Sequence, residues 1–126
     1  GKELRACVTP VSAVAGGSVT TLEGLPALYA EQRKLARAPA LHPVQEALLD
    51  EQAFQCGYCL NGMIMTAKAF LDRNPNPSEA QVRKALAANF CRCGTHNRIV
   101  RAVLRAAKAT AATTGRVSVA AEGASA

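Results

Sequence analysis

The chain has 126 residues and a net charge of +6, with three Phe, two Tyr and no Trp. This length fits one domain or one and a fraction, and no apolar run approaches the roughly 18 residues that span a bilayer. Five cysteines are an odd number, which argues against a small secreted scaffold held by disulfides. No signal peptide is visible. Gly1 is not a natural start, so we expect the chain to open in mid-domain.

The first 24 residues are predicted to be the C-terminal end of a β-domain. Residues 4–8 and 18–23 are two short strand candidates, separated by a turn at Gly16 and Gly17. Two short strands do not form a stable sheet alone, so the rest of the sheet is expected upstream or in a partner. Judged by itself, Cys7 in this segment is best interpreted as a small buried apolar residue.

Residues 25–42 are predicted to connect this segment to a helical domain, either as a short helix over 25–38 or as an irregular linker. The first convincing helix begins at Pro43, because proline suits the first helical position and apolar residues then follow at helical spacing. We expect it to end near residues 53–55. His42 is interpreted as a polar residue at the helix start rather than as a metal ligand.

Three further helices are predicted over about 60–72, 78–88 and 97–109 from apolar residues at a spacing of 3.6. Ser78 and Gln81 form a capping box that opens the middle one. The last helix carries a basic face, which is either solvated or a partner contact: Arg98, Arg101, Arg105 and Lys108. From Thr110 on, small and polar residues predict a disordered tail or an arm that orders on a partner. The fold class is therefore mainly α, a four-helix bundle.

The chemistry of the chain lies in two cysteine pairs. Cys56 and Cys59 precede one predicted helix, and Cys91 and Cys93 precede another. Helix N-termini offer free N–H groups and positive potential, which favour the thiolate that a metal needs. If the bundle packs these two helix starts side by side, four sulfurs meet in one metal site.

The residues around the pairs suit a [2Fe–2S] cluster. Gly57 and Gly94 let the backbone approach inorganic sulfide and donate N–H groups to it. Met63, Ile64 and Phe90 are expected to shield the site from water. From Ala80 to Ala121 the chain has basic residues and no acidic one, either as a solvated face or because it surrounds a negatively charged cluster.

Other kinds of site compete with this interpretation. Zinc also binds four cysteines that include a C-x₂-C pair, so by chemistry alone the iron–sulfur cluster leads only modestly. A thioredoxin-type dithiol should follow a β-strand, whereas the residues before Cys56 are predicted to be helical. Rieske ligation would need histidines within the pairs, and His42 and His96 lie elsewhere. The few scattered aromatics argue against nucleic-acid binding.

Three stretches, LHPVQ at 41–45, QCGYCLNGM at 55–63 and CRCGT at 91–95, resemble the small iron–sulfur subunit of molybdenum hydroxylases, the xanthine oxidase and aldehyde oxidoreductase family. The resemblance is strongest to the small subunits of bacterial members built from two or three subunits. It covers roughly residues 1–109, and the two-part cysteine motif is far more specific than a lone C-x-x-C.

The resemblance implies a ferredoxin-like β-grasp domain with one [2Fe–2S] cluster, followed by a four-helix domain with another. The four paired cysteines match the ligands of the helical-domain cluster: Cys56, Cys59, Cys91 and Cys93. Cys7 matches the last ligand of the ferredoxin-like cluster, whose other three ligands, expected upstream, are not in this sequence. The domains would then be 1–24 (incomplete ferredoxin-like), 25–42 (connector), 43–109 (helical [2Fe–2S] domain) and 110–126 (tail).

The resemblance also implies a role. Gln55 and Cys93 match positions that contact the molybdopterin cofactor of a large partner subunit. Electrons from an aldehyde or N-heteroaromatic substrate would pass from that cofactor through both clusters to a cytochrome c, a quinone or a flavin subunit. This chain would be the non-catalytic electron-transfer subunit of an oxidoreductase, cytoplasmic or alternatively periplasmic. From the residues alone, a zinc-stapled helical interaction module without a redox role remains the alternative.

Overall fold

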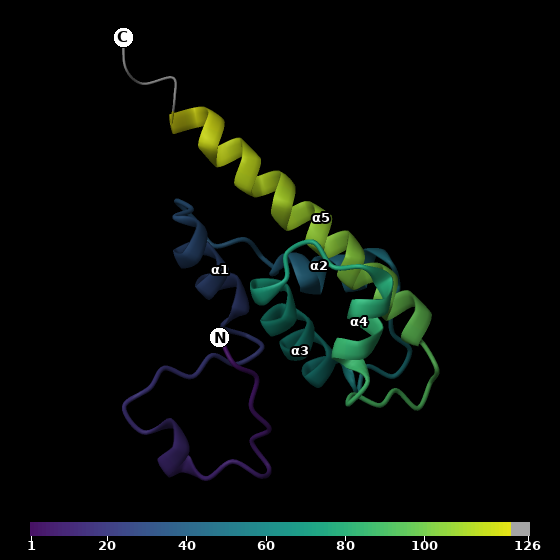
Figure 1. Ribbon diagram of the computed structural model, residues 1–126. Coiled ribbons are helices and arrows are strands. Elements are labelled where there is room, and N and C mark those ends of the chain that lie inside the picture. The colour runs from purple at the N-terminus through teal and green to yellow at the C-terminus, as the bar shows by residue number, and fades with distance from the viewer. Residues whose placement is uncertain (122–126) are drawn as a thin grey trace.

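The computed structural model describes the backbone of residues 1–121 and the side chains through Ala112. These residues contain a short 3₁₀ helix and five α-helices: η1 (Val11–Val14), α1 (Leu25–Arg33), α2 (Pro43–Asp50), α3 (Leu60–Arg73), α4 (Glu79–Leu86) and α5 (His96–Ala121). Figure 1 shows α2 and α4 against the first half of α5, with α3 beside α2 and α4, and α5 then extends well beyond the other helices. None of the described helices is both long enough and apolar enough to cross a membrane.

The core forms where α2, α3, α4 and α5 turn their apolar faces inward. Its fully buried large side chains include Val44 of α2, Met63 of α3, Val82 of α4, and Ile99 and Val103 of α5. These are the faces that the 3.6-residue spacing predicts, so the four predicted helices are confirmed. Their ends shift by a few residues, except that α5 continues well past its predicted end near residue 109.

Capping boxes fix the starts of two of these helices. The His42 Nδ1 atom accepts a hydrogen bond from the Val44 N–H at 3.1 Å, and the His42 N–H donates to Gln45 Oε1 at 2.8 Å. Ser78 and Gln81 exchange the same pair of contacts at the start of α4. The predicted capping box of α4 is confirmed, and His42 is a helix-capping residue as expected.

The two predicted strands are wrong for the described part of the chain, which contains no β-strand. A strand is stable only when a neighbouring strand accepts and donates its backbone hydrogen bonds. Without such a neighbour, residues 6–8 form a turn, in which the Val8 N–H donates to the Arg5 carbonyl at 3.1 Å. That residues 1–24 belong to a ferredoxin-like domain stays a prediction.

The connector contains α1, which is one of the two predicted alternatives; it buries Leu25 and Tyr29 and ends at Lys34 in the left-handed conformation (φ 52°). Among the described residues, α1 is therefore an additional helix besides the four of the predicted bundle. The predicted disordered tail is wrong as far as the structure describes it, because α5 continues from Thr110 to Ala121. Extending a helix that has already formed needs no new nucleation and adds one backbone hydrogen bond per residue. Residues 122–126 lie outside the described part.

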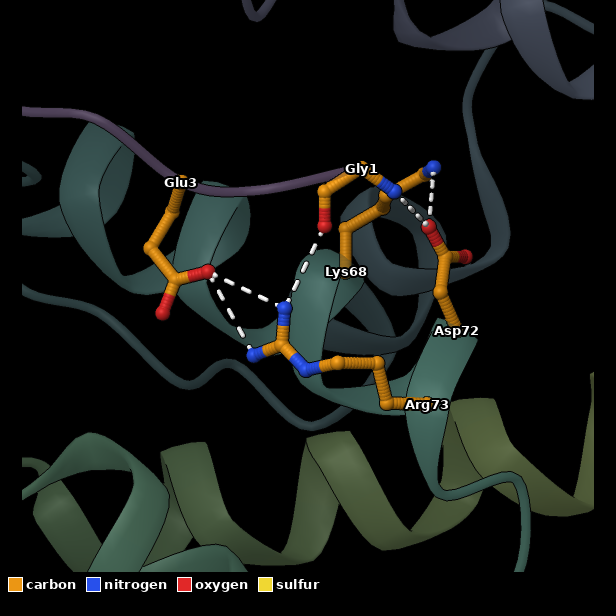
Figure 2. Close-up of polar contacts among 5 residues, drawn as sticks. All are labelled: Gly1, Glu3, Lys68, Asp72 and Arg73. Atoms are coloured by element: carbon orange, nitrogen blue, oxygen red, sulfur yellow. Dashed lines mark hydrogen bonds and ion pairs between the residues drawn. The ribbon is translucent and has the colours of Figure 1, made fainter.

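Polar contacts fasten the first residues of the chain to the C-terminal end of α3 (Figure 2). Arg73 contacts Glu3 at 3.4 Å and the Gly1 carbonyl at 3.2 Å. Asp72 accepts from Lys68 at 2.6 Å and from the Gly1 amino group at 3.3 Å. The exposed pair between Arg73 and Glu3 contributes little stability, whereas Lys68 is buried beside Asp72 within α3. The contacts of Gly1 and Glu3 together hold the N-terminal segment against the helical bundle.

Candidate metal centre

The structure brings four of the five cysteines together as two pairs, and each pair takes one cysteine from each sequence motif. The Cys93 and Cys56 sulfurs lie 3.4 Å apart and form what we name the outer pair. The Cys59 thiol donates a hydrogen bond to the Cys91 sulfur, and these two form the inner pair. Cys59 directly precedes α3, and Cys91 and Cys93 lie in the loop before α5. The two helix starts therefore lie next to each other, as predicted.

The pairs differ in depth. Cys91 is only 5% exposed and belongs to the apolar core, whereas Cys56 is exposed at the surface. Cys59 and Cys93 are half-buried. The sulfurs thus lead from the core of the bundle to its surface, and a group bound between them would be open to the outside on the Cys56 side.

Two glycines give the cysteine loops their shape. Gly57 and Gly94 have φ values of 79° and 75°, in the left-handed region that strains other residues. A Cβ atom built on either glycine meets nothing within 4 Å. Both loops therefore turn tightly, and the backbone of each is open toward space that a bound group can occupy.

In the outer pair the two thiols have opposite proton affinities. The Tyr58 backbone N–H and then the Cys93 thiol donate to Cys56 and lower its pKa. The Cys56 backbone N–H acts to lower the pKa of Cys93, but the bond from the Cys93 thiol to Cys56 and burial outweigh it and raise that pKa. The Cys56 sulfur therefore loses its proton more readily than the Cys93 sulfur.

In the inner pair, too, one thiol has a lowered pKa and the other a raised pKa. The Thr95 hydroxyl, which lies 3.3 Å from the Cys91 sulfur, is the main cause that lowers the pKa of Cys91 to about 7. Burial, followed by the hydrogen bond to Cys91, raises the pKa of Cys59 to about 11. Each pair therefore holds one thiolate-forming sulfur and one thiol, whose proton leaves when a metal binds.

The paired arrangement fits a cluster of two irons. A structural zinc site needs four ligands around one ion, whereas four cysteines around a [2Fe–2S] cluster bind as two pairs, one pair on each iron. Cys7 belongs to neither pair and lies exposed in the turn at residues 6–8.

The surroundings of the thiols are apolar inside and aromatic outside. Met63 and Ile64 are buried as expected, but Phe90 is 72% exposed and does not shield the site. Tyr58 is 94% exposed, and Phe54 is also partly open to solvent. The Arg92 guanidinium lies over the Phe90 ring, 5.4 Å from its centre. Aromatic side chains thus flank both cysteine loops at the surface.

Gln55 is exposed and lines a shallow hollow of about 630 Å³ beside the outer pair, together with Phe54, Gly94, Thr95 and Arg98. The basic face of α5 begins at this hollow and turns toward α2. Arg105 pairs with Asp50 at 2.8 Å, and Arg101 with Glu51 at 3.5 Å. Part of the predicted basic face is therefore paired within the chain.

The sequence analysis did not identify two residues that contact the cysteine loops, Thr95 and Arg5. The Thr95 hydroxyl contacts the Cys91 sulfur across the turn at residues 92–93, and helical spacing could not have indicated this contact because both residues precede α5. Arg5 donates to the Ala88 carbonyl just before the second cysteine loop. No local pattern indicates that contact, because it joins segments far apart in the sequence.

Comparison with known proteins gives a family match. A family model described as a [2Fe-2S] binding domain matches residues 28–104. The chain is 56% identical over 108 residues to a nicotinate dehydrogenase subunit of Pseudomonas putida, and the match covers 86% of this chain and 62% of that protein. It is 48% identical over 111 residues to the alpha subunit of isoquinoline 1-oxidoreductase from Brevundimonas diminuta, covering 88% of this chain and 66% of that one.

Two solved structures are also similar. Quinoline 2-oxidoreductase from Pseudomonas putida 86 aligns with a TM-score of 0.69 and 32% identity over 84% of this chain and 60% of that chain. Aldehyde oxidoreductase from Desulfovibrio gigas aligns with a TM-score of 0.74 and 37% identity over 88% of this chain and 12% of that chain. The chain spans less than two thirds of the length of the curated relatives described above.

Proposed function

Because this chain belongs to the [2Fe-2S] binding domain family, we propose that it holds one such cluster on its four paired thiols and passes electrons through it. The observation that carries the proposal is the pairing of the sulfurs across the two motifs. One iron would take the outer pair and the other the inner pair. Bound in this way, the cluster accepts and releases one electron at a time.

The residues of the chain prepare this site for a negatively charged cluster. Gly57 and Gly94 allow the tight turns of the two cysteine loops, and the Tyr58 backbone N–H, directly after Gly57, donates to the Cys56 sulfur. Reduction adds one negative charge, which positive charge nearby stabilises. The stacking of Arg92 on Phe90 holds a guanidinium within the second cysteine loop, which supports a role for Arg92 in raising the reduction potential.

We place this chain as the electron-transfer subunit of a molybdenum-dependent hydroxylase that oxidises an aldehyde or an N-heteroaromatic compound in a large partner subunit. The names of its relatives support this substrate class. Gln55 and Cys93 would contact the molybdopterin cofactor; Gln55 is exposed and Cys93 is half-buried. Tyr58 and Phe90, beside the two cysteine motifs, are exposed aromatic residues of the kind enriched in protein interfaces.

Cys7 would contribute the last ligand of a second, ferredoxin-like [2Fe–2S] cluster, with the other ligands upstream. Its exposure in a turn supports this assignment, because its sulfur is free to join ligands from another segment. From that cluster electrons would leave to a cytochrome c, a quinone or a flavin subunit. We place the complex in the cytoplasm, with the periplasm as the alternative.

Iron and acid-labile sulfide per chain, with an EPR spectrum after reduction by dithionite, test the proposal. The expected result is a red-brown protein that bleaches on reduction, with two iron, two sulfide and one rhombic signal on the four paired thiols. Cys93→Ser should lose or shift this signal, whereas Cys7→Ser should leave it intact. A colourless protein that carries one zinc would refute the proposed function.

A further inference from the structure

One residue of the N-terminal segment reaches the second cysteine loop. The Arg5 Nη2 atom donates a hydrogen bond to the Ala88 carbonyl at 3.1 Å. Ala88 lies between the end of α4 and Cys91, in the stretch that leads into the inner pair. The contact therefore joins the segment that contains Cys7 to the loop that presents a thiol of the metal centre.

The same residue also closes the turn that presents Cys7. The Arg5 carbonyl accepts from the Val8 N–H at 3.1 Å and from the Thr9 hydroxyl at 2.8 Å. Arg5 is thus bonded at both ends, with its backbone in the Cys7 turn and its guanidinium on the loop before Cys91. Movement of one loop relative to the other must break or bend these contacts.

A second contact, the ion pair between Glu3 and Arg73, holds the N-terminal segment at a different place on the bundle. The ion pair between Glu3 and Arg73 lies at the C-terminal end of α3 (Figure 2), whereas the thiols lie at the N-terminal end of that helix. The Glu3 contact therefore fixes where the segment starts, and the Arg5 contact fixes where its cysteine lies relative to the metal centre. A planar guanidinium suits this task, because its donors are held in a rigid fork.

We propose that Arg5 is a positioning residue that sets the separation between Cys7 and the four paired thiols. The inference rests on the proposed function, in which one electron leaves the group held by the paired thiols and one arrives at the group that Cys7 helps to bind. No bond forms or breaks in that step and no proton moves. Its rate depends on the gap between the two groups, which Arg5 would keep constant.

Energy transfer from a dye to the cluster tests the inference. In the cluster-loaded chain of this sequence, Cys7 is exposed and the paired thiols are occupied by iron, so a maleimide dye should label Cys7 alone; Cys7→Ser should remain unlabelled. The oxidised cluster absorbs visible light and shortens the fluorescence lifetime of a nearby dye. We expect one short, narrowly distributed lifetime in the unmodified chain.

Arg5→Ala should give a longer and more broadly distributed lifetime with unchanged iron content and helicity. Arg5→Lys, which keeps one donor group, should give a lifetime between that of Arg5→Ala and that of the unmodified chain. The matched control is Arg37→Ala, which removes the same charge from an exposed position outside the N-terminal segment and should keep the original lifetime. Equal lifetimes in Arg5→Ala and the unmodified chain would overturn the inference while leaving the proposed function intact. A chain without iron would refute the proposed function, and this inference with it.

Discussion

Protonation of His42 should destabilise the protein, because the cap of α2 requires the neutral ring. His42 is 5% exposed, and its Nδ1 atom must be unprotonated to accept from the Val44 N–H. Burial, and then the positive charge of Lys68, lower the pKa of His42 from 6.5 to about 4, although Asp72 opposes the shift. Tyr29 packs edge-on against the same ring.

The sign and size of the effect follow from this shift. A group whose pKa is lower in the folded state contributes stability above its unfolded pKa and loses it as pH falls toward the folded value. At 1.36 kcal/mol per pKa unit, the fall from 6.5 to about 4 corresponds to about 3 kcal/mol in total, of which about 2 kcal/mol is lost by pH 5. Stability should therefore decline between pH 6.5 and pH 4.

Urea unfolding at pH 7 and pH 5, followed by circular dichroism, measures this loss. His42→Asn is the control, since asparagine also caps helices but does not titrate. We expect the variant to be less stable at pH 7, because it loses the packing on Tyr29, but to fall less than the unmodified chain on acidification. If both proteins lost the same free energy between pH 7 and pH 5, His42 would not be the group responsible.

Three other substitutions test the packing and the metal centre. Gly94→Ala places a side chain at positive φ, so it should lower the free energy of unfolding by about 1–2 kcal/mol and should also lower the iron content. The control is Gly62→Ala in α3, where the added side chain meets only ordinary contacts, and this variant should keep its iron. Met63→Ala leaves a cavity at a fully buried position and should lower the free energy of unfolding, measured in urea, by about 2–5 kcal/mol. The control Leu49→Ala changes an exposed residue and should lower it by less than about 0.5 kcal/mol. Thr95→Val removes the hydroxyl beside a ligand sulfur and should make the reduction potential more negative, and Thr95→Ser should restore it; an unchanged potential would show that the hydroxyl only fills space.

The parts of the fold that were predictable are those set by local periodicity. The apolar spacing of α3 and α5 and the capping box at Ser78 involve residues within one or two turns of each other, so the sequence alone contains the signal. The prediction of two strands was wrong for the opposite reason. Alternating apolar and polar residues form a stable strand only when a partner strand pairs with them, and local sequence does not show whether one is present. The continuation of α5 beyond Thr110 was not predicted, because the small polar residues there do not show that a helix formed earlier in the chain extends through them.

The candidate site likewise has features that local sequence predicts and features that depend on tertiary packing. The grouping of the four cysteines followed from two short motifs placed before two helices. Which sulfur lies against which depends on how the two cysteine loops meet across the bundle, and the cross-motif pairs were therefore not predictable. The contact from Arg5 to Ala88 likewise depends on how the N-terminal segment folds back over the bundle.

The graded depth of the thiols also constrains the order in which a working complex can be built. Cys91 is enclosed by the core and Cys56 opens to the surface, so the iron and sulfide of the proposed cluster would enter and leave by the Cys56 side. The exposed Tyr58 and Phe90 rings lie next to the cysteines in the sequence, and the proposed partner subunit, if it bound there, would close that side. Under the proposed function, the cluster would therefore have to be inserted before the partner binds, and the bound partner would protect it from chelators and oxidants.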